Sequence, residues 1–112
     1  MAKTSTTLQL STAADTVQLG ETLAQFAQAG DSILLRGHIG AGKSSLARAF
    51  IRFHLGAEAE VPSPTFTLVQ VYDLADVEVW HADLYRLSHT EEAVELGLME
   101  AFEAQICLIE WP

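Results

Sequence analysis

The residues best suited to chemistry lie between Gly37 and Ser44, where the chain reads Gly-His-Ile-Gly-Ala-Gly-Lys-Ser. This stretch matches the pattern G-x-x-x-x-G-K-S, in which glycines let backbone amides turn inward around phosphate groups. It follows a short apolar segment and precedes a helical pattern, whose amino end favours an anion. The motif therefore predicts a loop that holds the phosphates of a nucleoside triphosphate.

Two side chains of this loop have expected roles of their own. Lys43 would reach the outer phosphates as a compact positive charge, and Ser44 would place its hydroxyl on a magnesium ion. A glycine-rich turn without a ligand is the alternative, which the flanking strand and helix patterns disfavour. The residues expected to contact the nucleotide are Gly37, Ile39, Gly40, Ala41, Gly42, Lys43, Ser44 and Ser45.

Hydrolysis of a nucleotide also needs acids that hold the metal or position a water, near the ends of strands adjoining the loop. Glu110 follows the apolar run from Ile106 to Ile109, and Asp83 follows the strand predicted from Val77 to His81. Taken alone, each acid fits a helix cap or a solvated loop charge equally well. The phosphate loop favours both as metal or catalytic residues.

The elements that must position these residues follow from apolar periodicity and from turn residues. Between them lie a small, acidic loop from Ala57 to Pro64 and a hairpin turn from Asp73 to Asp76. The expected elements are a weak strand from Thr6 to Leu10, a helix from a possible reciprocal cap at Thr12 to Gly30, a buried strand from Ser32 to Leu35, a helix from Leu46 to Gly56, strands from Thr65 to Tyr72 and from Val77 to His81, helices from Thr90 to Leu96 and from Leu98 to Phe102, and a buried strand from Ile106 to Ile109.

This order of elements predicts an α/β domain with a mixed sheet covered by helices. The chain has 112 residues, of which 49% are apolar, so residues 1–112 are expected to form a single domain with one core. The last strand pattern stops at Pro112, with no element after it to cover that edge of the sheet.

Composition narrows the possible functions. Fifteen Asp and Glu against six Lys and Arg give a net charge of −9, which disfavours broad attraction to nucleic acid or to anionic membranes. The single cysteine, Cys107, lies in an apolar run and is expected to be a buried thiol in a reduced compartment. Neither a signal-peptide pattern nor a membrane-spanning run is present, so a cytoplasmic location is expected.

Four motifs in this order and at these separations resemble the TsaE family, formerly called YjeE. They are Gly37 to Ser44, Ser63-Pro64-Thr65-Phe66, His81-Ala82-Asp83-Leu84-Tyr85-Arg86 and Glu110-Trp111-Pro112. The phosphate loop by itself occurs in many proteins, but the other three motifs together are specific to this family. The similarity covers nearly the whole chain.

The resemblance implies a weak ATPase of bacterial tRNA threonylcarbamoyladenosine biosynthesis that uses ATP and Mg²⁺. It also implies partners, TsaB and TsaD, of which TsaD transfers threonylcarbamoyl to an adenosine beside the tRNA anticodon; tRNA would be met only through that complex. Glu110 and Asp83 would serve the metal or the attacking water. Thr65, in a switch-like loop, would sense the γ-phosphate, while Trp111 would either stack near the site or pack in the core.

The sequence departs from the family pattern at two points. His38 stands where the family usually has an acid, so a role for that acid cannot be carried over, and a solvent-facing histidine is favoured. Family members normally continue for a few dozen residues beyond E-W-P, adding strands that complete the sheet. The chain is therefore expected to be truncated at its carboxyl end.

Two other functions compete with an ATPase. One is a P-loop kinase for a small substrate, which normally has an arginine-rich lid over the transferred phosphoryl group; the scattered arginines Arg36, Arg48, Arg52 and Arg86 form no such lid. The other is a nucleotide-binding interaction module that does not hydrolyse its ligand. His81 is expected to pack or cap locally, because no second histidine stands at metal-ligand spacing.

Overall fold

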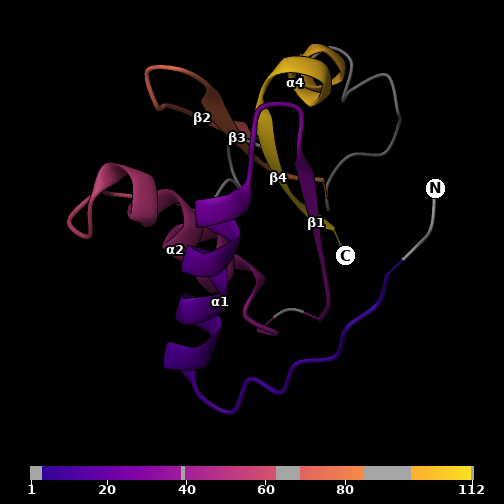
Figure 1. The fold of residues 1–112 in the computed structure, drawn as a ribbon, viewed down its shortest axis with the longest axis vertical. Coiled ribbons are helices and arrows are strands. Elements are labelled where there is room, and N and C mark those ends of the chain that lie inside the picture. Colours follow the sequence, from indigo (N-terminus) through magenta and orange to yellow (C-terminus); the bar gives the residue numbers. More distant parts are fainter. Residues whose placement is uncertain (1–3, 39, 63–68, 85–96, 112) are drawn as a thin grey trace.

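The computed structural model describes residues 4–38, 40–62, 69–84 and 97–111, and Figure 1 shows their arrangement. The strands form one mixed sheet in the order β1-β4-β3-β2, in which β4 runs parallel to both of its neighbours and β2 runs antiparallel to β3. The predicted α/β architecture is confirmed. The elements are α1 (Ala13–Phe26), β1 (Ser32–Arg36), α2 (Lys43–Leu55), β2 (Val69–Asp73), β3 (Glu78–Asp83), α4 (Leu98–Ala104) and β4 (Ile106–Trp111).

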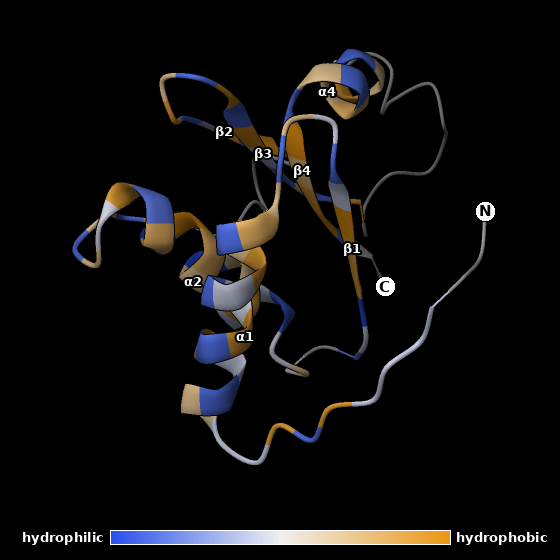
Figure 2. Ribbon diagram, in the orientation of Figure 1, coloured by the Kyte–Doolittle hydropathy of each residue, from blue (hydrophilic) through white to orange (hydrophobic). Residues whose placement is uncertain are grey.

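Helices cover both faces of the sheet. On one face α1 and α2 enclose an apolar cluster with Phe50 and Leu108 at its centre, and on the other α4 packs against Cys107 and Ile109. Alternate residues of β4 therefore enter two different clusters, which explains its unbroken apolar sequence. Figure 2 shows the apolar residues that run along β4, in the middle of the sheet. Cys107 is a buried free thiol, as predicted.

Helix α1 begins where the sequence predicts. Thr12 and Asp15 form the reciprocal cap: the Thr12 hydroxyl accepts from the Asp15 amide at 3.2 Å, and the Asp15 carboxylate accepts from the Thr12 amide at 3.1 Å. The helix ends at Phe26, earlier than the predicted limit at Gly30, which instead has φ +92° in the turn that leads to β1. The Gln28 amide donates to the Asp31 carboxylate at 2.7 Å, and this local bond replaces the helical pattern.

The contact between α1 and α2 is a close approach of two backbones. A β-carbon added at Gly20 of α1 would lie 2.6 Å from the Leu46 carbonyl oxygen and 3.0 Å from the Ala49 β-carbon. Glycine is therefore required at position 20 for this packing distance. Because the phosphate-loop motif leads directly into α2, the same contact sets where that loop lies.

Two predictions about strands on the amino-terminal side are wrong. Thr6 to Leu10 has no regular structure, and Leu8 and Leu10 are 60% and 41% exposed; the weak alternation finds neither a pairing strand nor a surface to cover it. The first real strand, β1, is not buried as predicted but alternates between half-buried and exposed positions. Leu34 is 62% exposed because, within the described residues, β1 packs against helices only on its α1–α2 side, through Ile33 and Leu35.

The remaining strands start or end later than predicted. β3 continues to Asp83 and β4 to Trp111, so both candidate acids belong to strands instead of following them. The apolar pattern of the sequence ends before these acids, whereas the backbone pairing of β3 with β4 continues through Asp83 and Glu110. The hairpin turn is confirmed, with the Ala75 amide donating to the Asp73 carboxylate at 2.8 Å. The strand residues predicted from Thr65 to Leu68 and the helix from Thr90 to Leu96 lie outside the described residues.

Candidate active site

The glycine-rich loop joins the end of β1 to the start of α2. Gly40 and Gly42 have φ values of +85° and +101°, in the left-handed region that other residues rarely adopt. Gly42 is the N-cap of α2 and supplies no side-chain oxygen to the helix. The amides of the first helical turn, which have no acceptor within the helix, therefore face the loop, as an anion site requires.

Lys43 lies across this loop. Its ammonium nitrogen donates to the Gly37 carbonyl at 2.7 Å, so the two ends of the motif are held together and a positive charge lies over the loop. The His38 side chain is exposed, as favoured from the sequence, and its carbonyl accepts from the Ala41 amide at 3.0 Å. Ile39 lies outside the described residues.

A hydrogen bond connects the loop to the sheet. The Ser44 hydroxyl donates to Oε1 of Glu110 at 2.8 Å, joining the first turn of α2 to β4 across 66 positions of the sequence. Glu110 is only 6% exposed. The loop serine and the acid near the end of β4, which the sequence assigned separately to a magnesium site, are thus in direct contact.

His81 occupies the other oxygen of the same carboxylate. Its Nε2 lies 2.6 Å from Oε2 of Glu110, and the imidazole is 1% exposed. Because an ionised carboxylate only accepts hydrogen bonds, Nε2 is the donor. Among the described residues, Nδ1 of His81 is buried and has no partner.

These contacts keep Glu110 ionised. Burial alone would raise the pKa of Glu110, but hydrogen bonds from His81 and Ser44, together with the charges of His81 and Lys43, outweigh burial and hold its pKa below the usual value. A negative charge is therefore held next to Ser44 at the amino end of α2. That charge can accept a proton or a hydrogen bond, or bind a cation.

Asp83 lies beside Glu110 on the neighbouring strand. The two residues are partners in the parallel register of β3 and β4, so their side chains leave the same face of the sheet. The Leu84 amide also donates to the Glu110 carbonyl at 3.1 Å. On this face the apolar positions of β3 and β4 give way to His81, Asp83 and Glu110 as the strands approach the loop.

The structure thus brings together the loop residues Lys43 and Ser44 with both candidate acids. Ser45 is exposed in the first turn of α2. Thr65, Tyr85 and Arg86 lie outside the described residues, and so does the side chain of Trp111. The sequence reasoning missed the contact of His81 with Glu110. The signal available for it was the spacing of two between His81 and Asp83, which places both on one face of a strand.

A magnesium ion bound by protein alone would need several oxygen ligands in octahedral geometry. No group of three or more His, Cys, Asp or Glu side chains within the described ranges is arranged as a metal site. Magnesium bound with a nucleotide needs few protein ligands, because phosphate oxygens and waters complete its shell. Ser44 donates a hydrogen bond to Glu110 and so keeps oxygen lone pairs available for a cation. The residues at this edge of the sheet fit a magnesium–nucleotide complex.

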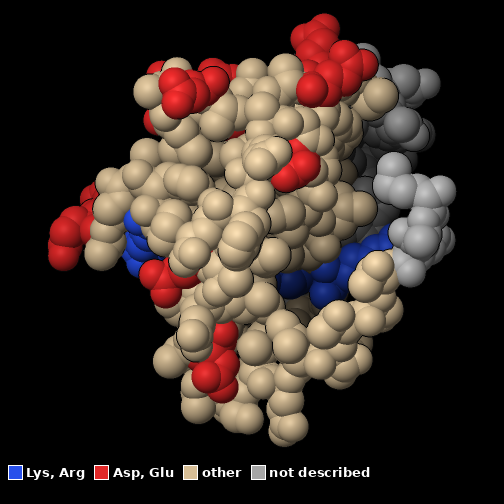
Figure 3. Space-filling view, viewed as in Figure 1, with Lys and Arg blue, Asp and Glu red and all other residues tan. Residues whose placement is uncertain are grey.

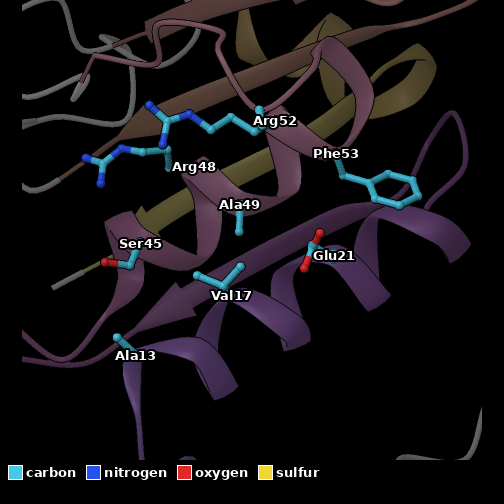
Figure 4. Close-up of a pocket in the computed structure, with 9 residues that line it drawn as sticks. Ala13, Val17, Glu21, Ser45, Arg48, Ala49, Arg52 and Phe53 are labelled. Atoms are coloured by element: carbon cyan, nitrogen blue, oxygen red, sulfur yellow. The ribbon is translucent and has the colours of Figure 1, made fainter.

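A hollow lies away from Ser44 and Glu110. It is a groove of about 320 Å³ between α1 and α2, shown in Figure 4. Val17 and Ala49 line its floor, while Arg48 and Arg52 point away from α1. Of the predicted nucleotide-binding residues that the structure describes, only Ser45 lines this groove.

Surface charge agrees with the composition. Figure 3 shows acidic side chains spread over the visible face, with Lys and Arg confined to small areas. This face has no broad basic surface of the kind that nucleic acid binding requires. None of the helices in the described part of the chain has the length and apolar character needed to cross a membrane.

Residues 10–112 match the family model described as threonylcarbamoyl adenosine biosynthesis protein TsaE. A tRNA threonylcarbamoyladenosine biosynthesis protein TsaE from Rickettsia conorii is 41% identical over 97 residues, which are 87% of this chain and 55% of that protein. The protein of the same name from Bacillus subtilis is 38% identical over 98 residues, covering 87% of this chain and 60% of the relative. The crystal structure of Bacillus subtilis YdiB matches with a TM-score of 0.67 and 29% identity, over 91% of this chain and 61% of that one. The chain thus spans a little over half the length of these relatives.

Proposed function

The chain belongs to the TsaE family, and we propose that it binds and hydrolyses ATP with Mg²⁺ in support of tRNA threonylcarbamoyladenosine modification. Its partners in this role are TsaB and TsaD, and tRNA is met only through them. The relatives carry the name of that biosynthesis, and the phosphate loop supplies the chemistry. The fold supports phosphate binding by the loop, because α2 begins at the loop and presents its amides to a phosphate.

One observation carries the proposal: Ser44 donates to a buried, ionised Glu110 at 2.8 Å, directly beside Lys43. A glycine-rich turn with no ligand has no need for a buried carboxylate on its hydroxyl. Burying a charge is costly unless it is paired and hydrogen-bonded, so such an arrangement is expected where the charge is used.

Each residue has a distinct task in this proposal. The loop amides and Lys43 bind the β- and γ-phosphates. Ser44 would offer its oxygen to Mg²⁺, while Glu110 accepts a hydrogen bond from the serine hydroxyl and thereby orients it. Asp83, on the adjacent strand at the same edge, is the second acid near the metal and the attacking water. When bound, the metal neutralises charge that develops on the transferred phosphoryl group.

Thr65 completes the proposed site as the residue that senses the γ-phosphate. Hydrolysis then resets the assembly with TsaB and TsaD between turnovers. We therefore expect slow ATP hydrolysis by the protein alone and faster hydrolysis with TsaB and TsaD, because the complex responds to the nucleotide that is bound.

The test uses purified protein with a fluorescent ATP analogue for binding and phosphate release for turnover, each with and without TsaB and TsaD. Lys43→Ala should weaken nucleotide binding by roughly 10- to 100-fold, the worth of a hydrogen bond from a charged group. Glu110→Gln should bind ATP and lose turnover. Glu103→Gln, an exposed acid on α4, is the matched control and should do neither.

Turnover that TsaB and TsaD leave unchanged would contradict the proposed role in the modification complex. Full turnover in Glu110→Gln would contradict the assignment of Glu110. Binding with no hydrolysis under any condition would make the protein a nucleotide-binding module without ATPase activity.

A further inference from the structure

We propose that His81 is a positioning residue: it fixes the Glu110 carboxylate so that one oxygen faces Ser44 and the serine oxygen is presented to the metal. This inference rests on the proposed function, because it assigns His81 a task in magnesium–nucleotide binding. It differs from simple packing or local capping, the role expected of His81 from the sequence.

The carboxylate of Glu110 is held at both oxygens by donors from different elements. Ser44 reaches Oε1 from α2, and His81 reaches Oε2 from β3. A carboxylate held at only one oxygen can rotate about its terminal bond, which is a soft torsion. With Oε2 held at 2.6 Å by a ring on a paired strand, the plane of the carboxylate is set.

The pairing of β3 with β4 fixes the position of His81 relative to Glu110. His81 lies opposite Leu108 in the register of β3 and β4, two residues before the Asp83–Glu110 pair, so it approaches Glu110 along the diagonal. Its ring is buried among apolar neighbours, with Val79 and Leu108 both fully buried on the same face. A side chain enclosed in this way has little freedom to leave the carboxylate.

The chemistry of the position also argues against packing alone. An apolar side chain would fill this space at lower cost, because an imidazole brings two polar nitrogens into the core. Nε2 is satisfied by Glu110, while Nδ1 has no partner among the described residues. Every hydrogen bond that the described structure gives this ring therefore goes to Glu110.

The consequence falls on Ser44. When Glu110 accepts the hydrogen bond from the serine hydroxyl along a fixed direction, the lone pairs of Oγ point elsewhere and can meet a cation. If the carboxylate turns, the serine hydroxyl rotates with it, and the cation loses a ligand. Loss of His81 should therefore weaken binding that depends on magnesium and leave metal-independent phosphate binding by the loop intact.

Two amide variants separate positioning from structure. In His81→Gln the amide nitrogen lies three bonds from the β-carbon, as Nε2 does in histidine, so it still reaches Glu110. In His81→Asn the nitrogen lies two bonds away, at the level of Nδ1, and cannot reach it. Both variants bury a polar amide, so they are matched in chemistry and differ in reach. His81→Leu removes the donor altogether.

The measurement is the affinity for a fluorescent ATP analogue with Mg²⁺ and with EDTA, alongside thermal unfolding of each variant. For His81→Asn and His81→Leu we expect the gain in affinity from Mg²⁺ to fall by about 10- to 100-fold, the usual effect of removing a group that orients a metal ligand. Affinity in EDTA should stay within about twofold of the wild-type value, and His81→Gln should recover most of the magnesium effect.

The results that would overturn this role of His81 differ from those that would overturn the proposed function. A wild-type protein whose nucleotide binding ignores Mg²⁺ overturns the proposed function itself. A wild-type protein that responds to Mg²⁺, together with a His81→Asn variant that responds equally well, overturns the role of His81 alone. Equal losses with Mg²⁺ and EDTA, or equal defects in His81→Gln and His81→Asn, would show that the ring only supports the fold.

Discussion

Gly20→Ala tests whether the backbone contact of α1 with α2 controls stability. Helix propensity alone predicts a gain, because alanine in a helix interior is about 1 kcal/mol more favourable than glycine. The structure predicts the opposite sign. The added β-carbon would lie 2.6 Å from the Leu46 carbonyl oxygen, a backbone atom within α2, and 3.0 Å from the Ala49 β-carbon.

The size of the effect follows from two opposing contributions, the gain in helix propensity and the cost of the close contacts. Carbon atoms in contact prefer separations of about 3.5–4.0 Å, so α1 must move outward by several tenths of an ångström. Overpacking of this kind costs about 1–3 kcal/mol. After the propensity gain is subtracted, Gly20→Ala should destabilise the protein by about 1 kcal/mol, and by up to about 2 kcal/mol if α2 cannot shift.

Urea unfolding followed by circular dichroism measures this difference. Gln18→Ala, on the exposed side of the same helix, is the control and should change stability by less than about 0.5 kcal/mol. Adding Ala49→Gly to Gly20→Ala removes one of the two close contacts, so the double variant should be more stable than the sum of the single changes predicts. A Gly20→Ala protein more stable than the wild type would refute the close packing described for the two helices.

Two further predictions concern the hairpin and the buried acid. Ala75 has φ +76°, which costs an L-residue about 1–2 kcal/mol, so Ala75→Gly should stabilise the protein by about 0.5 kcal/mol after the entropy cost of glycine, as read from a raised urea midpoint; a lowered midpoint would contradict the strain. Glu110 has a folded-state pKa below the ordinary value for a glutamate, because the effect of burial is outweighed by hydrogen bonds from His81 and Ser44. Its ionised form therefore stabilises the fold at pH values above the pKa of the unfolded chain, and this contribution is lost as pH falls through the folded-state pKa. Unfolding free energies of wild type and Glu110→Gln, measured from pH 7 down to pH 3.5, should converge as pH falls, and a constant difference would rule out the lowered pKa.

Much of the candidate site could be predicted because its signals are local. The spacing of the glycines with Lys43 and Ser44 reports a loop and a helix start from eight consecutive residues, and both are present. Glu110 was identified from the apolar run before it. The contact of His81 with Glu110 was not predicted, because the spacing of two between His81 and Asp83 indicates a shared face of one strand but not which strand pairs with it or in what register.

The sequence by itself determined the glycine-rich loop, the capped start of α1, the hairpin turn and the α/β class, since each depends on residues a few positions apart. Only the tertiary structure decided that Ser44 and His81 hold opposite oxygens of one carboxylate. Those groups come from a helix and two strands, and the parallel pairing of β3 with β4 brings them within hydrogen-bonding distance. It also decided that Gly20 is required, because a glycine inside a helix is unfavourable until another backbone lies against it.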